Sequence, residues 1–136
     1  MIKAALFWMG LGAALGVMMY LGYRVPLLRW TLTLRSVHVH MMLMGGVMQM
    51  IVGVALWMFP RRKDAPHWPT PSQGWSVFTL LNLGALIRSV CGGLPQTSAA
   101  FWGGLVGIAL QMCGMLLFFA LIYHRIRGPG PSQTLE

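Results

Sequence analysis

The 136-residue chain is 57% hydrophobic and only 9% charged, with a mean hydropathy of +0.67. This composition excludes an ordinary soluble globular domain, in which about a quarter of the residues are charged. Ten Lys or Arg residues against two acidic ones give a formal net charge of +8, and most of these charges stand between apolar segments. A nucleic-acid-binding surface is polar and interleaves basic with aromatic residues, so the charge indicates membrane topology instead. We expect the lipid bilayer, and no nucleic acid, as a partner.

Four apolar segments reach the length of about 20 residues that a membrane-spanning helix needs. They cover residues 4–23, 36–59, 75–94 and 99–123, and each is too long and continuous for a buried strand. The sequence therefore predicts an all-α fold, an integral membrane four-helix bundle that we expect to be oligomeric. Residues 1–127 form its single transmembrane domain and residues 128–136 a flexible tail. The first segment lacks a convincing cleavage motif, so we expect it to remain as an anchor.

The basic residues between these segments predict an orientation in the inner (cytoplasmic) membrane. One side of the predicted bundle carries Lys3, Arg61, Arg62, Lys63, Arg125 and Arg127, and the other carries Arg24, Arg29 and Arg35, with Arg88 close to it. The positive-inside rule then favours cytoplasmic locations for both termini. The connection over residues 24–35 alternates apolar residues with Arg and Thr, so we expect it to lie in the membrane interface.

Two histidines, His38 and His40, stand at the start of the second segment. At this spacing their side chains point about 200° apart on a helix, so they cannot bind one metal from one face. Each can serve a different neighbour. An imidazole inside a bilayer is costly unless it is paired or ligated, which makes the pair a functional hypothesis. Hydration or an interhelical hydrogen bond near the interface is the open alternative.

The segment RSVHVHMMLMGGVMQMIVGVALWMFPRR resembles the tenth helix of subunit I of heme-copper oxidases and nitric oxide reductases. The matching residues are His38, His40, Gly45, Gly46, Gly53, Trp57, Phe59 and Pro60. In that family the first histidine ligates the high-spin heme and the second the low-spin heme. The last segment, GGLVGIALQMCGMLLFFALIYHRIR, is similar to a pattern in small relatives of the same superfamily. The resemblance implies that His38 and His40 ligate the iron of heme b.

A complete subunit of that family has more helices than this chain and takes other ligands from them, so we do not expect oxygen or nitric oxide reduction by this chain alone. Because that subunit has pseudo-threefold symmetry, a four-helix chain looks like one of its arcs. This implies a homotrimer in which His40 of one protomer and His38 of the next share a heme, for electron transfer, heme handling or gas binding. One alternative is a heme-free accessory or assembly subunit of a respiratory oxidase or nitric oxide reductase. Another is a structural module that associates through glycine-rich faces, with Gly10, Gly12 and Gly16 on the first segment and Gly103, Gly104, Gly107 and Gly114 on the last.

Three further residues are candidates for the cofactor's surroundings. Arg35 lies about one turn before His38, where its guanidinium can pair with a heme propionate. Arg88, inside the third segment, either pairs with a propionate or extends to the interface. Gly45 either leaves room for a flat macrocycle or allows close helix packing.

Other potential metal ligands have plainer interpretations. Six of the 12 methionines stand in the second segment, where thioethers can bind Cu(I) or act as flexible packing residues. His67 and His124 lie outside the apolar segments, so we expect both on the surface.

Overall fold

The structure is a computed structural model, and it describes residues 1–58, 70–95 and 97–123. All regular secondary structure in these residues is helical, in the order α1 (Ile2–Gly22), η1 (Pro26–Leu34), α2 (Arg35–His40), η2 (Met41–Met48), α3 (Gln49–Met58), α4 (Pro71–Gly93) and α5 (Ser98–Tyr123). Four helical stretches are long and apolar enough to cross a membrane. The prediction of an all-helical chain with four candidate membrane spans is therefore confirmed. The predicted tail and His67 and His124 lie outside the described residues.

The second span begins earlier than its apolar pattern predicts. The elements η1, α2, η2 and α3 join into one helical stretch, Pro26–Met58, whereas the apolar segment starts at residue 36. Its first part is a 3-10 helix that begins with Pro26, whose fixed φ suits a first helical position. The fully buried Thr31 donates its hydroxyl to the Leu28 carbonyl at 2.7 Å and lies 3.2 Å from the Met18 carbonyl of α1. This contact holds η1 against α1.

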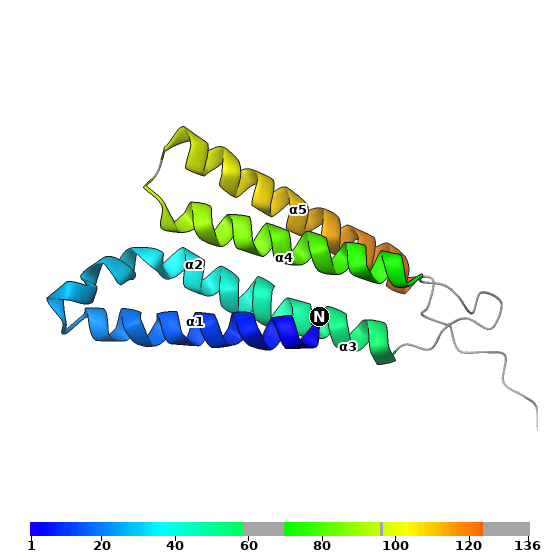
Figure 1. Cartoon of the computed structure of the whole chain (residues 1–136), viewed down its shortest axis with the longest axis horizontal. Coiled ribbons are helices and arrows are strands. Elements are labelled where there is room, and N and C mark those ends of the chain that lie inside the picture. The colour runs from blue at the N-terminus through cyan, green and yellow to red at the C-terminus, as the bar shows by residue number, and fades with distance from the viewer. Residues whose placement is uncertain (59–69, 96, 124–136) are drawn as a thin grey trace, which may run out of the picture.

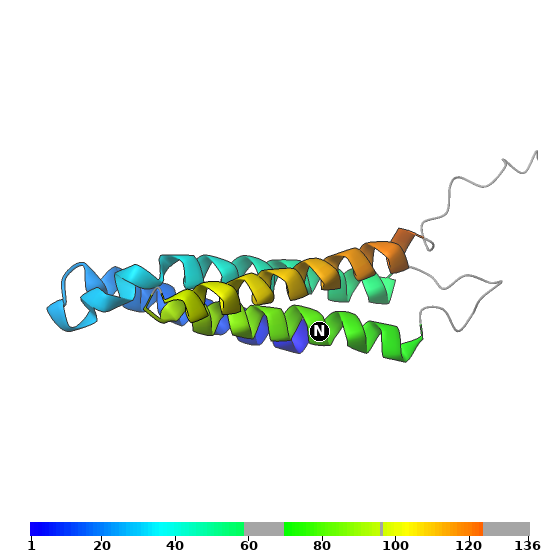
Figure 2. The ribbon, with the colours of Figure 1, turned by 90° about the horizontal axis from the view of Figure 1, so that it is seen from above.

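The four spans run antiparallel to their neighbours in sequence (Figure 1). α1 lies beside the second span and α4 lies beside α5, so the molecule consists of two helical hairpins. An indole hydrogen bond joins them, because Trp8 Nε1 of α1 donates to Asn82 Oδ1 of α4 at 3.0 Å. Viewed from above, both hairpins follow the long axis of the molecule (Figure 2).

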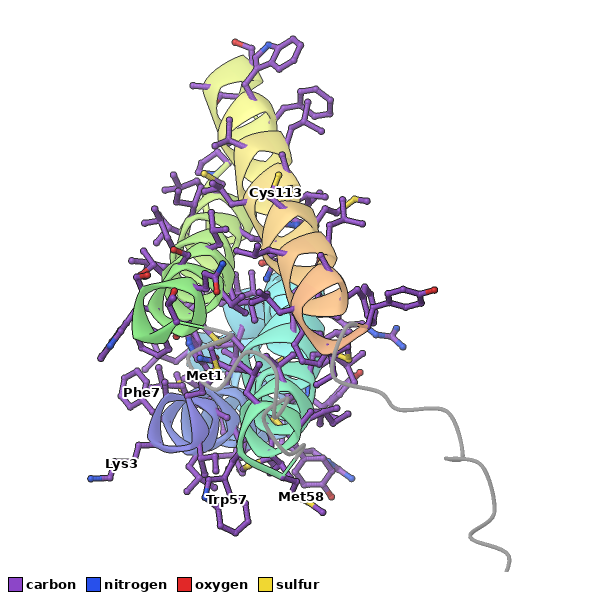
Figure 3. All side chains as sticks on the ribbon, turned by 90° about the vertical axis from the view of Figure 1, so that its right-hand side faces the viewer. Met1, Lys3, Phe7, Trp57, Met58 and Cys113 are labelled. Atoms are coloured by element: carbon purple, nitrogen blue, oxygen red, sulfur yellow. The ribbon has the colours of Figure 1, made fainter. Side chains whose placement is uncertain are left out.

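Apolar packing joins the hairpins most fully at the end that holds Met1. The buried residues there are Val52 of α3, Val77 and Leu81 of α4, and Phe118, Leu121 and Ile122 of α5. Figure 3 looks onto this end and shows Trp57 pointing away from the other helices, where it is 82% exposed. We call this six-residue core the closed end. At the opposite end α5 diverges from α2 (Figure 1), and we call that region, around Ser36 and Arg88, the open end.

An irregular helical segment follows the histidine pair directly. η2 is a π-helix of 8 residues, in which hydrogen bonds span five residues. Its glycines receive side chains from α1, with Trp8 against Gly45 and Met9 against Gly46. Long π-helices are uncommon, and π-bulges occur frequently at functional sites. The π-helix is therefore a second feature, besides the histidines, that marks this region as a candidate functional site.

Candidate functional site

His38 is held between the second span and α1. Its Nδ1 lies 2.8 Å from the Gly12 carbonyl oxygen, and its ring lies beside Gly16, where an added Cβ would be 2.9 Å from Cε1. A carbonyl oxygen only accepts hydrogen bonds, so Nδ1 carries the hydrogen and donates it. In the neutral imidazole the lone pair then belongs to Nε2.

His40 has the same tautomer for a different reason. Its Nδ1 lies 2.9 Å from the carbonyl oxygen of Ser36, one turn earlier in the same helix. Nδ1 again donates, which leaves the Nε2 lone pair of the half-buried ring without a partner among the described residues. Both histidines of the pair thus present Nε2 as the potential ligand atom.

The two rings lie on different sides of α2. His38 faces α1, whereas Val37, the residue before it, is buried against Gly92 of α4, with its Cγ2 3.0 Å from an added Cβ there. His40 lies on the flank that carries Ser36, two residues and about 200° from His38. One chain therefore directs its two Nε2 atoms to separate surroundings.

The two rings could each supply one ligand to a metal, and a heme iron needs no more than that from each. Ligating histidines almost always donate their other ring nitrogen to a carbonyl, carboxylate or water, which fixes the tautomer. Both rings meet this condition. Within residues 1–58, 70–95 and 97–123 no group of three or more His, Cys, Asp or Glu side chains can enclose a metal ion. A macrocycle needs only one or two axial ligands, so the donor set matches that requirement.

Of the three other predicted site residues, Arg35 and Gly45 lie close to His38 in sequence. Arg35 is exposed at the first position of α2, free to pair with an anionic group. Gly45 is buried, and the Trp8 indole fills the space beside it, with Cγ 2.7 Å from where a Cβ would stand. Close helix packing, one of the two interpretations of Gly45, is what this structure displays.

Arg88 lines a cleft of about 310 Å³ at the open end. Thr33 and Ser36 contribute from the second span, Cys91 and Gly92 from α4, and Phe101 and Leu105 from α5, among other residues of that helix. The Arg88 Nε is buried and has no hydrogen-bond partner among the described residues. The cleft lies on the flank of α2 that carries His40, because Ser36 belongs to both. A larger, mostly apolar groove of about 670 Å³ runs between α1 and α4 and is not lined by either histidine.

Several residues of this region were not recognised from the sequence as parts of the site. Gly12 supplies the carbonyl that orients His38, and Gly16 makes room for its ring. From the sequence both are candidates for oligomer contacts, but in the structure they contact His38 of the same chain. Gly104 and Gly107 likewise face Arg88 of α4. The spacing of Gly12 and Gly16, four residues apart, signals close helix packing but does not reveal the partner.

Gln49 is a further polar residue that sequence analysis did not single out. It is 0% exposed, at the start of α3, and neither side-chain amide atom has a hydrogen-bond partner among the described residues. Burying an amide without a hydrogen-bond partner costs free energy, so Gln49 lowers the stability of the single chain.

No family model matches the chain, and neither a curated protein nor a solved structure matches it. The resemblance to subunit I of heme-copper oxidases remains a prediction from the residues named above.

Proposed function

We propose that this chain is an integral membrane protein that binds heme b through His38 and His40 and acts in electron transfer, heme handling or gas binding. The observation that carries the proposal is the shared tautomer of the two rings, each fixed by an Nδ1 hydrogen bond to a backbone carbonyl. A histidine arranged in this way offers Nε2 as a ligand without needing to reorient. Bound heme would supply one-electron redox chemistry or a coordination position for a diatomic gas.

The directions of the two rings favour a shared cofactor. His38 faces α1 and His40 faces the opposite flank, so the two Nε2 atoms of one chain do not converge on one iron. We infer a closed homotrimer in which His40 of one protomer and His38 of the next ligate the same heme. Arg35, exposed one turn before His38, is the propionate partner in this arrangement. The inner membrane, with both termini cytoplasmic, is the proposed location.

Visible spectra of the full chain, purified in mild detergent and measured oxidised and reduced, test cofactor binding. We expect a Soret band and reduced α and β bands of a b-type heme, with about one heme per chain. His38→Ala and His40→Ala should each remove most of this absorption, whereas His67→Ala serves as the matched control and should retain it. A colourless wild-type protein would rule the proposal out.

Sharing between protomers is tested by co-expressing His38→Ala and His40→Ala chains with different tags. A mixed trimer contains some interfaces at which an intact His40 meets an intact His38. For random mixing of equal amounts we expect about a quarter of the wild-type heme content to return. No recovery in isolated mixed oligomers would place each heme within one protomer.

A heme-free accessory subunit is the second candidate, and one observation favours it. The His38 ring already has a hydrogen bond and a glycine surface within its own chain, as a histidine with a purely structural role would. A colourless protein that co-purifies with a respiratory oxidase or nitric oxide reductase would support this function.

A further inference from the structure

Arg88 is a permanent positive charge, and no acidic side chain is present among the described residues to pair with it. A guanidinium does not deprotonate in proteins, so inside a membrane span it must meet an anion or reach water. The chain has only two acidic residues, Asp64 and Glu136. Both lie outside the described residues, and Arg88 lies five residues before the end of α4. An anion supplied by another molecule would neutralise this charge.

The surroundings of the Arg88 side chain direct its charge toward the membrane interface. Nη1 lies 3.6 Å from where a Cβ of Gly92 would stand and 3.7 Å from that of Gly104. Gly92 is one turn closer to the end of α4, so the guanidinium extends toward that end between two residues without side chains. Phospholipid phosphates lie just outside the hydrocarbon core, at the depth that such an extended arginine reaches.

The cleft beside Arg88 combines polar groups with an apolar wall. Ser36, which carries a hydroxyl, lines it together with Thr33. Opposite, α5 contributes the exposed side chains of Phe101, Leu105 and Ile108. This combination suits a molecule with an anionic group at one end and hydrocarbon at the other.

We propose that this cleft binds the phosphate group of a membrane phospholipid through Arg88 and Ser36, in the leaflet on the η1 side, with an acyl chain along α5. A volume of about 310 Å³ accommodates the phosphate and glycerol part of one lipid and leaves the acyl chains in the bilayer. The lipid neutralises Arg88 and occupies the cleft that residues of the second span, α4 and α5 line.

Native mass spectrometry of the delipidated full chain in detergent tests this site. The probes are dioleoylphosphatidylglycerol, dioleoylglycerol, which lacks the phosphate, and inorganic phosphate as a competitor. We expect one tight phosphatidylglycerol per chain, weak binding of dioleoylglycerol, and little displacement by millimolar inorganic phosphate. Equal binding of the two lipids would overturn the proposal, as would a phosphate ion that binds as tightly as the lipid.

Variants assign the binding to the cleft. Arg88→Gln should weaken phosphatidylglycerol binding about tenfold or more, because it removes a charge-assisted hydrogen bond, and Ser36→Ala about threefold. Arg88→Lys should retain an intermediate affinity. Arg29→Gln is the matched control, an exposed arginine of η1 outside the cleft, and should change the affinity less than about twofold.

Unchanged lipid affinity in Arg88→Gln would reject the lipid site. If the same variant also lost its heme, Arg88 would be assigned to a propionate. If Arg88→Gln does not fold, Arg88→Lys and Ser36→Ala carry the same test, and wild-type affinity in both would reject the proposal.

Discussion

The closed end and the open end of the bundle differ in what their helices bury. At the closed end, side chains such as Val52, Leu81 and Phe118 interlock between three helices. At the open end α5 diverges from α2, and Arg88 and Ser36 line a cleft. Lipid tails are as apolar as the closed end, so helices there gain mainly van der Waals contact. One end therefore supplies packing, whereas the other retains Arg88, whose Nε has no hydrogen-bond partner among the described residues.

The largest effect is expected from removing the same side chain at each end. Phe118 of the closed end is 6% exposed and Phe101 of the open end is 61% exposed. Phe118→Ala leaves a cavity among the helices and should lower the free energy of unfolding by about 3 kcal/mol. Phe101→Ala should cost less than about 0.5 kcal/mol. Unfolding in mixed micelles with increasing dodecyl sulfate measures both, and equal losses would remove the distinction between the ends.

A smaller effect is expected from adding a methyl group beside His38. At Gly16 the new Cβ would lie 2.9 Å from Cε1 of the ring, so the imidazole has to move. Gly16→Ala should lower stability by about 1 kcal/mol, since overpacking outweighs the gain in helix propensity. It should also shift the Soret maximum or reduce heme content.

Gly10→Ala is the matched control for Gly16→Ala. Gly10 belongs to the same helix, and nothing lies within 4 Å of its added Cβ. Its stability should stay constant or rise by up to about 1 kcal/mol, because alanine favours helix more than glycine does. Identical spectra for Gly16→Ala and the wild type would show that the His38 ring position does not matter to a cofactor.

The four helical spans could be predicted from the sequence because an apolar segment of about 20 residues is enough to indicate a membrane-spanning helix. The divergence of His38 and His40 could also be predicted, since it follows from a fixed helical rotation per residue. The 3-10 start of the second span could not, because it depends on Thr31 reaching the Met18 carbonyl, a contact between residues 13 positions apart.

The roles of the glycines in the candidate site could not be predicted from the sequence. Gly12, Gly16 and Gly45 are equally compatible with oligomer contacts, cofactor space or packing until the opposite helix is known. The structure pairs them with Met42, His38 and Trp8, respectively. For the same reason the sequence does not predict which glycines lie beside Arg88, because this contact involves a helix later in the chain.

The smallest effect concerns the hydrogen bond that joins the two hairpins between the ends. Trp8 Nε1 donates to Asn82 Oδ1 at 3.0 Å, while the Asn82 Nδ2 donates to the Phe78 carbonyl of its own helix at 2.8 Å. Interhelical hydrogen bonds in membranes average about 0.6 kcal/mol, because the separated helices find other partners. A double-mutant cycle of Trp8→Phe and Asn82→Ala should give a coupling energy of that size. A coupling near zero would mean that side-chain packing, and not this hydrogen bond, holds the hairpins together. A value well above about 1.7 kcal/mol would make this bond a main link between the two hairpins.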